Sequence, residues 1–374
     1  MKFKISSKIL LTHLSNVSKV VNPKNTIQIL NNFLFELKDK ELIVTGTDTE
    51  NTIVARMELD ECDGDCAFAV PAKRMLDLLK ELPDQSLDFD VDLTNFEIHI
   101  IYSNGDYKFM GVDGSEFPRL ENESEEQLTM TIPAVELTKS IERTVFAVSQ
   151  DSLRLIMTGI LLDVKPDKII FVASDTHKLV RYINQRVTPD IEGSFILPSK
   201  PAGILSSVLA KEENDVKVIF DTKSASFETS NYTFVCQFIN GKYPNYEMAI
   251  PKVNPYSMIV DRVQLLNAVR RVAVFATEGG LVQLDIADGH IHIKTQDLEY
   301  ASSAEESLTC EYSDERIVHG FNKDRMIEVL SNIEGDNLEI RFSAPGRPGL
   351  FLPVEQPEGE DCIALLMPMV VPNA

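Results

Sequence analysis

Three aspartates at matching places in similar stretches of sequence are the residues best placed for acid–base chemistry. They are Asp48 in VTGTDTE, Asp175 in VASDTHKL and Asp297 in IKTQDLEY. His177 follows Asp175 by two residues and could complete a catalytic pair, but Glu50 and Glu299 take its place in the other two stretches. Without a nucleophile or phosphate-binding motif, an Asp-x-His sequence is more typical of a capped turn. An enzyme that uses Asp175 as its acid remains an alternative, and activity that vanished in Asp175→Asn would support it.

The cysteines are the other candidates for chemistry, as metal ligands or in disulfides. There are five, at Cys62, Cys66, Cys236, Cys310 and Cys362. Three residues separate Cys62 from Cys66, and no second Cys or His pair lies near them in sequence to complete a zinc site. We therefore predict that the cysteines are reduced and structural. For the protein as a whole we predict no metal ion, no cofactor and no catalytic residue.

Length and charge limit the classes of protein to consider. The chain has 374 residues, of which 44% are hydrophobic, and this is enough for two or three globular domains. No apolar run approaches the roughly 20 residues that cross a bilayer, and the opening MKFKIS is typical of a strand rather than of a signal sequence. The formal net charge of −22 argues against a protein that grips nucleic acid through its whole surface. We expect a cytoplasmic protein that does not bind membranes.

The chain repeats one long pattern three times, and each copy has two helical segments. They span 6–20 and 71–82, then 133–149 and 198–211, then 260–277 and 322–333. In the first helix of each copy, apolar positions follow spacings of four, three and four residues, which is typical of a buried helix face. These positions are Leu10, Leu14, Val17 and Val21, then Leu137, Ile141, Thr144 and Val148, then Leu265, Val269, Val272 and Ala276.

Strand-like stretches fill the rest of each copy. Examples are 42–47, 96–102, 168–174, 216–221, 234–239, 290–295 and 338–342. Pro71 and Pro198 stand where the first residue of a helix is expected, and Asn322 stands at the matching place as an N-cap. Each copy therefore predicts a strand, a helix, several strands, a second helix and several more strands. Repeats of this length are whole domains in series.

The charge is divided unevenly between helices and strands. The six helical segments hold fourteen Lys and Arg against seven Asp and Glu, a net of +7, which leaves −29 for the rest of the chain. This division suggests that a surface built from helices meets a polyanion. At a Debye length of about 8 Å, acidic groups on the far side of a domain hardly reach it. Ordinary solvated helix faces remain the simpler alternative.

Several motifs, in order along the chain, resemble the bacterial DNA polymerase III beta subunit, the replication sliding clamp. They are the opening MKFKI, TGTD (45–48), ASDTHKL (173–179), the FP of DGSEFP (113–118), NGKYPNY (240–246) and LLMPM (365–369). The resemblance implies an α+β fold of three tandem clamp domains at 1–122, 123–250 and 251–374, each with two helices against two antiparallel sheets. It also implies a head-to-tail homodimeric ring around duplex DNA, with the helices lining the hole.

The resemblance assigns the basic helix residues to DNA. Those expected to face it are Lys8, Lys19, Lys24, Lys73, Arg74, Lys139, Arg143, Lys200, Lys211, Arg270 and Lys323. Lys24 and Lys200 match basic DNA-contacting places of the family. Such contacts go to phosphate and carry no sequence information. Arg74 and Arg270 could equally serve the junction between two chains.

The resemblance also implies an apolar pocket for peptides of the replicative polymerase, the clamp loader and other clamp-binding proteins. Its expected wall is Leu155, Ile156, Met157, Ser174, Thr176, His177, Lys178, Leu179, Pro244, Met248, Ala249, Leu365, Met367, Pro368 and Met369. Methionine suits such a site because it adapts to different apolar ligands. A core-facing last strand is the alternative for LLMPM. The family often has Gly and Arg in place of Thr176 and Lys178, and basic residues in place of Glu247 and Met248, which bears on peptide preference.

A closed ring must pair the open sheet edges of two chains. By resemblance, the strand Tyr107–Met110 pairs with the third domain of the second chain. The expected contacts are Arg74, Leu78, Tyr107, Phe109, Arg271, Val274, Phe275, Glu299, Glu305 and Glu306. Phe275 could instead belong to the helix core.

The function expected from the resemblance is a processivity factor that encircles duplex DNA and tethers a polymerase. A protein-binding scaffold that never encloses DNA is the second alternative, because it would have the pocket without the ring. Charge reversal of Lys24 and Lys200 separates the two: a clamp would lose loading or DNA synthesis with its pocket intact, and a scaffold would be unaffected.

Overall fold

The computed structural model describes most of the chain, as two compact units. The described residues are 1–22, 26–59, 61–119, 127–297, 300–344 and 346–371. Lys24, Glu299 and nearly all of the acidic linker at 121–127 lie outside them. One unit contains Met1–Val135 and Gly203–Phe238, and the other contains Glu136–Ala202 and Ile239–Ala374. The units cut across the three predicted domains, because strands of successive domains pair into shared sheets.

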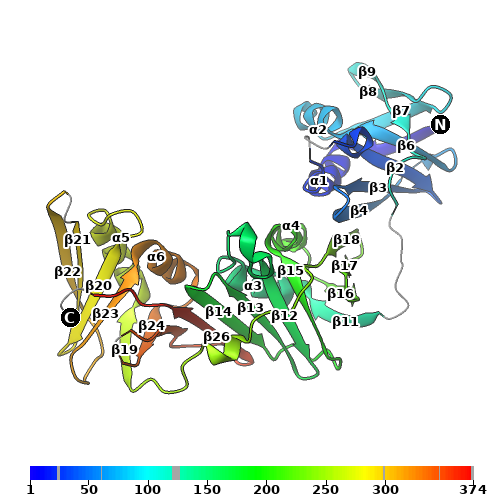
Figure 1. The fold of residues 1–374 in the computed structure, drawn as a ribbon. Helices are drawn as coiled ribbons and strands as arrows, with labels where there is room; N and C mark the ends of the chain where they lie inside the picture. Colours follow the sequence, from blue (N-terminus) through cyan, green and yellow to red (C-terminus); the bar gives the residue numbers. More distant parts are fainter. Residues whose placement is uncertain (23–25, 60, 120–126, 298–299, 345, 372–374) are drawn as a thin grey trace. The chain divides into compact units, whose positions relative to one another are not determined.

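All six predicted helices are present, each somewhat shorter than its predicted span. They are α1 (Ser7–Val17), α2 (Ala72–Glu81), α3 (Ala134–Val145), α4 (Ser199–Leu209), α5 (Arg262–Ala273) and α6 (Lys323–Asn332). Short 3-10 helices form η1 (Gln28–Asn31), η2 (Ser152–Thr158) and η3 (Tyr246–Met248). Helices α5 and α6 lie side by side against strands of the second unit (Figure 1). The predicted order of helices and strands in each copy is confirmed.

Side-chain caps explain where several helices begin. Asp261 accepts a hydrogen bond from Gln264 N at 2.7 Å at the start of α5. Asn322 accepts from the backbone N–H groups of Asp324 and Arg325 at 3.1 Å each, so its predicted role as an N-cap is confirmed. Pro71 occupies the N-cap of α2 rather than its first helical residue, one place earlier than predicted.

The first unit contains two antiparallel sheets. The five-stranded sheet has the order β5 (Glu61–Cys62), β1 (Lys2–Ser6), β7 (Ser86–Asp92), β8 (Glu97–Tyr102), β9 (Gly105–Met110). The nine-stranded sheet has the order β10 (Val112–Asp113), β6 (Cys66–Pro71), β2 (Asn32–Lys38), β3 (Glu41–Thr47), β4 (Asn51–Glu58), β18 (Tyr232–Gln237), β17 (Ser224–Glu228), β16 (Asp215–Phe220), β11 (Leu128–Pro133). The pairing of β4 with β18 joins the first copy of the repeat to the second.

The second unit also contains two antiparallel sheets. The eight-stranded sheet has the order β15 (Gly193–Pro198), β12 (Gly159–Lys165), β13 (Lys168–Ser174), β14 (Lys178–Asn184), β26 (Glu360–Leu366), β25 (Gly349–Pro353), β24 (Asn337–Phe342), β19 (Tyr256–Asp261). The four-stranded sheet has the order β22 (Ser302–Thr309), β21 (His290–Asp297), β20 (Leu281–Ala287), β23 (Ile317–Asn322). The pairing of β14 with β26 joins the second copy to the third.

The predicted helix faces form part of the core, except at two helix ends. Leu10, Leu14 and Val17 are fully buried on α1, and the stripes of α3 and α5 are buried in the same way. Val21 and Ala276 are only half-buried, and both lie beyond the ends of their helices, Val17 in α1 and Ala273 in α5.

One predicted strand is also too long. The strand expected over 234–239 ends at Gln237 in β18. The next two residues hydrogen-bond outside the ladder, Phe238 N to Lys223 O at 2.7 Å and Ile239 N to Ile196 O at 3.0 Å.

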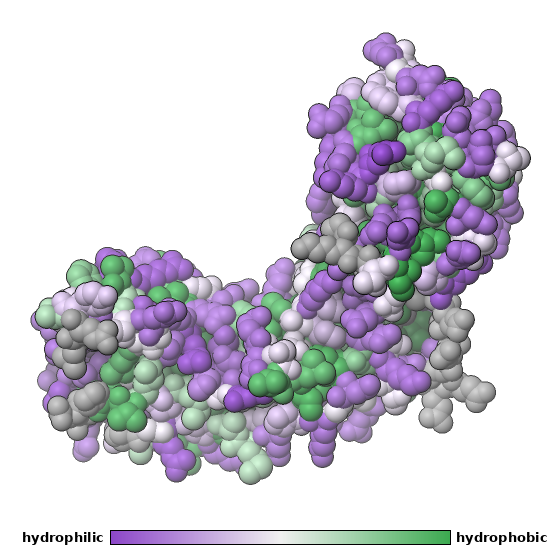
Figure 2. All heavy atoms as spheres, turned by 45° about the horizontal axis from the view of Figure 1, so that its top comes forward, coloured by the Kyte–Doolittle hydropathy of each residue, from purple (hydrophilic) through white to green (hydrophobic). Residues whose placement is uncertain are grey.

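Polar side chains cover most of the surface that Figure 2 shows, with apolar side chains in small groups. Leu153, Met248 and Val370 are the most exposed large apolar residues, at 93%, 84% and 90%. Within the described ranges, no helix is long and apolar enough to span a membrane. All five cysteines are free.

A buried ionic cluster ties α3 to the start of β26. The carboxylate of Glu360 is completely buried and contacts three cations: Lys139 Nζ at 2.6 Å, Arg143 Nη1 at 2.5 Å and Arg186 Nη1 at 3.0 Å. Arg143 also pairs with Glu334. Removal of one partner of a buried ion pair strongly destabilises a protein, because the other charge then remains unpaired in the core.

His319 on β23 lies in an aromatic cluster of the second unit. Its ring centroid is 4.8 Å from that of Phe342 and 6.1 Å from that of Phe321, and the residue is only 1% exposed. Burial lowers the pKa of His319, and a backbone contact at Ser343 opposes part of this shift. The imidazole is therefore neutral in the folded chain near neutral pH.

We expect His319 to make the free energy of unfolding fall as the pH drops below about 6.5, because the unfolded chain then binds a proton that the buried ring does not. For this group the loss reaches at most about 1.4 kcal/mol at pH 5.5. Urea midpoints at pH 7.5 and 5.5 should therefore differ less in His319→Phe than in the wild type. The same pH dependence in both proteins would contradict this role.

Candidate functional site

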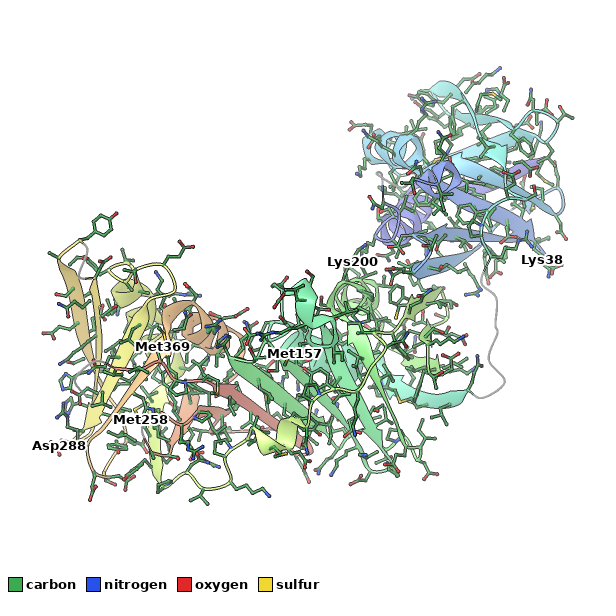
Figure 3. All side chains as sticks on the ribbon, viewed as in Figure 1. Lys38, Met157, Lys200, Met258, Asp288 and Met369 are labelled. Atoms are coloured by element: carbon green, nitrogen blue, oxygen red, sulfur yellow. The ribbon has the colours of Figure 1, made fainter. Side chains whose placement is uncertain are left out.

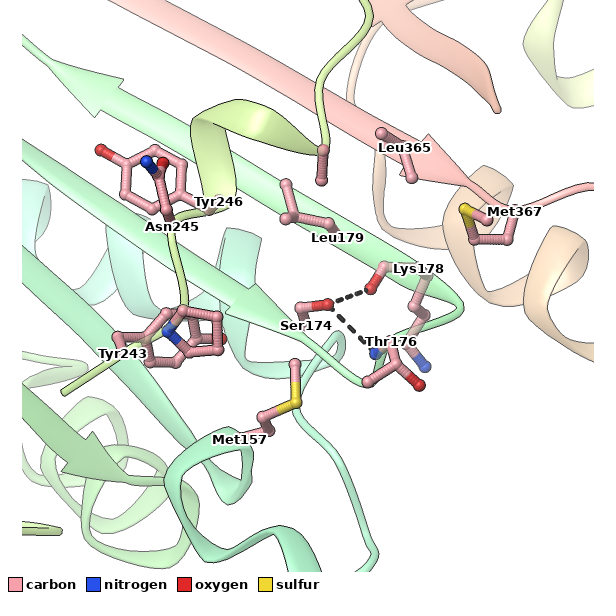
Figure 4. Close-up of a pocket in the computed structure, with 12 residues that line it drawn as sticks. Met157, Ser174, Thr176, Lys178, Leu179, Tyr243, Asn245, Tyr246, Leu365 and Met367 are labelled. Atoms are coloured by element: carbon pink, nitrogen blue, oxygen red, sulfur yellow. Dashed lines mark hydrogen bonds between the residues drawn. The ribbon is translucent and has the colours of Figure 1, made fainter. Parts of the chain in front are cut away.

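An apolar pocket of about 170 Å³ lies within the second unit (Figure 4). Its lining comes from η2, the turn between β13 and β14, η3 with the segment before it, and the end of β26. The lining residues are Met157, Ser174, Thr176, Lys178, Leu179, Tyr243, Pro244, Asn245, Tyr246, Ala249, Leu365 and Met367. The pairing of β14 with β26 places Leu179 opposite Leu365, so two leucines from distant parts of the sequence form its floor.

The turn that carries Asp175 is built by side-chain hydrogen bonds to the backbone. Asp175 Oδ1 accepts from the N–H groups of His177 and Lys178 at 2.8 Å each. Ser174 Oγ donates to Lys178 O at 2.8 Å and accepts from Thr176 N at 3.1 Å, as Figure 4 shows. Asp175 is therefore a turn cap, which favours the structural interpretation over the catalytic pair with His177.

Thr176 in this turn has an unusual backbone conformation. Its φ angle is +79°, a left-handed value that a β-branched residue rarely adopts. Thr49, at the matching place of the first copy, has a φ angle of +80°. The two copies thus build their acidic turns in the same way, although only the turn with Thr176 borders the pocket.

Carboxylates neutralise the cations at one rim of the pocket. The ammonium of Lys178 contacts Glu328 on α6 and lies 3.6 Å from Asp175 Oδ2. Arg325, also on α6, lies 3.7 Å from the same oxygen of Asp175. Arg154 Nη1 donates to Thr176 Oγ1 at 2.7 Å. This rim therefore presents mainly aliphatic and hydroxyl surface to a ligand.

Tyr246 closes the opposite side of the pocket. Its hydroxyl lies 3.5 Å from Asp163 Oδ2, and burial together with the charge of Asp163 raises the pKa of Tyr246 to about 12. Burial also raises the pKa of Tyr243. Both phenols therefore remain neutral at physiological pH, so the pocket is suited to apolar side chains.

Nine of the fifteen residues predicted for the pocket line it, and six do not. Those that do not are Leu155, Ile156, His177, Met248, Pro368 and Met369. Ile156 packs against the core beneath the pocket, and Met248 at the end of η3 is exposed. His177 lines a neighbouring cavity of about 340 Å³ that also contains Arg325 and Glu328. Figure 3 places Met157 on η2 and Met369 on the C-terminal segment.

The sequence prediction missed three lining residues, Tyr243, Asn245 and Tyr246. All three belong to NGKYPNY, from which only Pro244 was predicted. The two tyrosines on either side of a proline in that motif were the available signal, since aromatic residues commonly line ligand sites.

The predicted DNA-facing residues differ widely in exposure. The exposed ones are Lys8, Lys73, Arg74, Lys200, Lys211 and Arg270. Figure 3 shows Lys200 at the start of α4. Lys19 is half-buried and donates to Asn16 Oδ1 at 2.8 Å and Ser207 Oγ at 2.7 Å, and burial lowers its pKa. Lys323 is also half-buried and donates to Ala276 O at 3.2 Å.

Two of the residues predicted to face DNA belong to the buried ionic cluster. Arg143 is 7% exposed, and its guanidinium lies over the ring of Tyr182, 4.9 Å from the centroid. Lys139 is half-buried on Glu360. Their charges are balanced inside the chain, so they do not add to a basic face, and the assignment of Arg143 to DNA does not fit its buried position.

Two strands predicted to meet across a chain junction are open edges of their sheets. Strand β9 is at the edge of the five-stranded sheet, and β22 is at the edge of the four-stranded sheet. Tyr107 on β9 is 40% exposed, and Val274 and Phe275 just after α5 are 77% and 47% exposed. Exposed apolar groups beside an unpaired edge are typical of an interface. Phe275 is therefore not part of the helix core.

The other predicted junction residues have partners in the same chain or are less exposed. Phe109 is 8% exposed, and Leu78 is half-buried. Arg271 binds Glu306 through two hydrogen bonds of 2.8 and 2.7 Å, which lower the pKa of that carboxyl. Arg74 and Glu305 are exposed. Among the described residues, no group of three or more His, Cys, Asp or Glu side chains could hold a metal ion.

Comparison with known families matches nearly the whole chain. Models of the N-terminal, central and C-terminal domains of the DNA polymerase III beta subunit match residues 1–121, 131–245 and 247–370, in that order. The beta sliding clamp of Pseudomonas aeruginosa is 27% identical over 371 residues, which cover 99% of this chain and all of the relative. That of Staphylococcus aureus is 23% identical over 376 residues, 98% of each chain.

Solved structures give the same result. A sliding clamp from Pseudomonas aeruginosa bound to griselimycin superposes with a TM-score of 0.94 at 26% identity, over 99% of this chain and all of the other. A beta subunit from Thermotoga maritima, at 23% identity and a TM-score of 0.90 with the same coverage, shows the shared fold. The chain belongs to the DNA polymerase III beta subunit family, the bacterial beta sliding clamps. It is therefore a DNA sliding clamp and a processivity factor rather than an enzyme.

Proposed function

We propose that two copies of this chain close head to tail into a ring around duplex DNA, and that each copy holds partner proteins in the pocket of its second unit. The observation that carries the ring is the way successive copies of the repeat join. β4 pairs with β18, and β14 pairs with β26, while the corresponding strands β22 and β9 remain open. A second copy supplies the missing partner of each. Clamp domains at 1–122, 123–250 and 251–374 fit this arrangement.

The DNA-facing surface of the proposed ring consists of the exposed basic residues of the helices and of the turns after them. Lys8, Lys73, Lys200 and Arg270 have the exposure that phosphate contacts need. Retention is topological, since a closed ring cannot leave an unbroken circle of DNA. The acidic remainder of the surface is then compatible with DNA binding, because screening limits its reach to about 8 Å.

The pocket in this proposal takes apolar side chains from peptides of the replicative polymerase, the clamp loader and other DNA-processing proteins. Its neutralised rim and its neutral tyrosines favour leucine, methionine or phenylalanine over charged residues. Each such side chain contributes about 1.5–3 kcal/mol when it is buried, before the cost of ordering the peptide. Affinity is therefore modest, which allows partners to exchange.

Met367→Ala is expected to weaken binding of a clamp-binding peptide of the cognate polymerase about tenfold, because the side chain lines the pocket. Met369→Ala is the matched control: Met369 is 36% exposed against 40% for Met367, but it does not line the pocket. Its expected effect is less than about twofold. Fluorescence anisotropy of a labelled peptide measures both. Equal losses in the two variants would place the peptide elsewhere.

A further inference from the structure

The junction inside the first unit fixes which residues meet when two clamp domains join. Strand β4 pairs with β18 so that Ile53 lies opposite Phe234. Both residues are buried, at 0% and 1% exposure. Gln237 N donates to Glu50 O at 3.1 Å, and hydrogen-bonded pairs alternate along an antiparallel ladder. Ile53 and Phe234 therefore form a non-hydrogen-bonded pair.

The junction inside the second unit repeats this arrangement. Strand β14 pairs with β26 so that Val180 lies opposite Ala364. Their exposures are 1% and 0%. Met367 N donates to His177 O at 2.7 Å, and the same alternation makes Val180 and Ala364 a non-hydrogen-bonded pair.

The residue of β22 that corresponds to Ile53 and Val180 can be identified by counting from the aspartate of each acidic turn. Ile53 is the cross-strand partner of Gly46, and Val180 is the partner of Ala173. Gly46 and Ala173 each stand two places before the aspartate of the turn. Thr295 stands two places before Asp297, and its cross-strand partner is Ala304. Ala304 is therefore the residue of β22 that corresponds to Ile53 and Val180.

The residue of β9 that corresponds to Phe234 and Ala364 can be found in the other half of each domain. There, residues that lie opposite one another on successive strands form a row across the sheet. Starting from the first strand of the domain, the rows are Met130, Val218, Phe227, Phe234 in the second copy and Met258, Ile340, Phe351, Ala364 in the third. In the first copy the row is Phe3, Phe89, Ile100, Tyr107. Tyr107 thus corresponds to Phe234 and Ala364.

We infer that the junction between two chains pairs Tyr107 of one copy with Ala304 of the second, in the register of the two internal junctions. The inference rests on the proposed ring and specifies how its two open edges meet. Tyr107 is 40% exposed in the single chain, and in the inferred register the second copy covers this exposed surface. One residue along, the same register places Asp106 opposite Glu305.

That neighbouring pair distinguishes the chain-to-chain junction from the two internal ones. The corresponding pairs are Thr233 with Val54 in the first unit and Ile363 with Arg181 in the second. Neither brings two like charges together, whereas two carboxylates face each other at the junction between chains. Like charges directly opposite on neighbouring strands are destabilising. The acid pair therefore weakens the ring where it must open to admit DNA.

Neighbouring groups in each chain limit this repulsion without removing it. His99 contacts Asp106 across β8 and β9, and Lys294 lies opposite Glu305 across β21 and β22. Lys108 on β9 would be diagonal to Glu305 in the inferred register, farther away than a directly opposite residue. We therefore expect the acid pair to change the dissociation constant several-fold rather than by orders of magnitude.

Disulfide cross-linking tests the register directly. In a background with Cys62, Cys66 and Cys310 replaced by serine, Tyr107→Cys is combined with Ala304→Cys, Ser302→Cys or Glu306→Cys. A non-hydrogen-bonded pair has Cα atoms about 4.5 Å apart, within disulfide range, whereas diagonal positions are about 7–8 Å apart. Mild oxidation should link two chains through the pair at 107 and 304 at least about tenfold faster than through the other two.

The outcomes separate the register from the ring. Faster linkage at 302 or 306 would overturn the inferred register and leave the ring intact. A background protein that sediments as a monomer at micromolar concentration would overturn the proposed ring itself.

Charge variants test the acid pair. Asp106→Lys should lower the dissociation constant of the dimer about three- to tenfold in analytical ultracentrifugation, and Asp106→Asn should lower it by less. Glu58→Lys on β4 is the control, since it makes the same charge change at an exposed site in the other sheet of the first unit. An unchanged or raised dissociation constant in Asp106→Lys, or an equal gain in Glu58→Lys, would overturn the role of the acid pair.

Discussion

Val274→Glu combined with Phe275→Glu is expected to convert the dimer into stable monomers and to abolish processive DNA synthesis. Both side chains are exposed, at 77% and 47%, so the substitutions leave the core of the chain intact. In the proposed ring these residues lie at the junction between chains. Removal of two apolar contacts of about 1.5–3 kcal/mol each, together with the desolvation of two carboxylates, predicts a dissociation constant at least about a hundredfold higher.

Sedimentation at micromolar concentration measures this effect, and primer extension on a long template measures its consequence. Val253→Glu is the control, because Val253 is 76% exposed but lies in the segment after η3, far in sequence from β9 and β22, the two edges that meet in the proposed ring. It should remain dimeric. A double variant that is still a dimer, or a monomeric one that still supports long extension products, would refute the proposed ring.

Glu360→Gln is expected to cause a large loss of stability in the second unit. The carboxylate of Glu360 has no solvent exposure and contacts Lys139, Arg143 and Arg186, of which Arg143 is buried. Loss of this charge leaves the buried guanidinium of Arg143 with the exposed Glu334 as its remaining ion-pair partner, and breaking a buried ion pair typically destabilises a protein by about 3–5 kcal/mol. For a unit of this size the melting temperature should fall by roughly 10 °C.

The pKa of Glu360 gives this prediction a pH dependence. Burial raises the pKa, but the hydrogen bond from Lys139 and the charge of Arg143 outweigh it, so the net shift is downward. A carboxyl with a lowered pKa contributes stability above its ordinary value of 4.5, and the contribution is lost as the pH falls below that value. The difference in melting temperature between wild type and Glu360→Gln should therefore shrink below about pH 4.5.

Glu358→Gln is the matched control for this substitution, since Glu358 is exposed and only two residues away. Its melting temperature should stay within about 2 °C of the wild type, as for most surface substitutions. If Glu360→Gln behaved like this control, the buried cluster would not hold α3 to β26 as its geometry indicates.

The helices could be predicted from the sequence because their buried stripes depend only on local periodicity. The helix ends could not be predicted, because the last turn depends on the hydrogen-bond partners that the chain has after the helix. At α5, for example, the segment after Ala273 leaves the helix and places Val274 and Phe275 at the surface. The burial of Arg143 could not be predicted either, because its partner Glu360 lies more than 200 residues away and the local sequence gives no sign of the pair.

The pocket was predictable in part for a similar reason. Motifs identified the segments that meet, but the lining depends on the direction of each side chain. Met369 N bonds to Gly320 O at 2.7 Å, which leads the C-terminal segment along β23 and away from the pocket. Met248 comes at the end of η3 and is directed to solvent, 84% exposed, while Tyr246 on the same short helix lines the pocket.

The most direct test of the proposed ring is whether the chain is held on DNA by topology. The labelled protein is loaded onto a nicked circular plasmid with the cognate clamp loader and ATP, and the plasmid is then linearised with a restriction enzyme. We predict that the protein stays with the circle through gel filtration in moderate salt and is lost within minutes of linearisation, unless the DNA ends are blocked. Equal retention on circular and open linear DNA would show binding by contact rather than by encirclement, and would contradict the proposed ring.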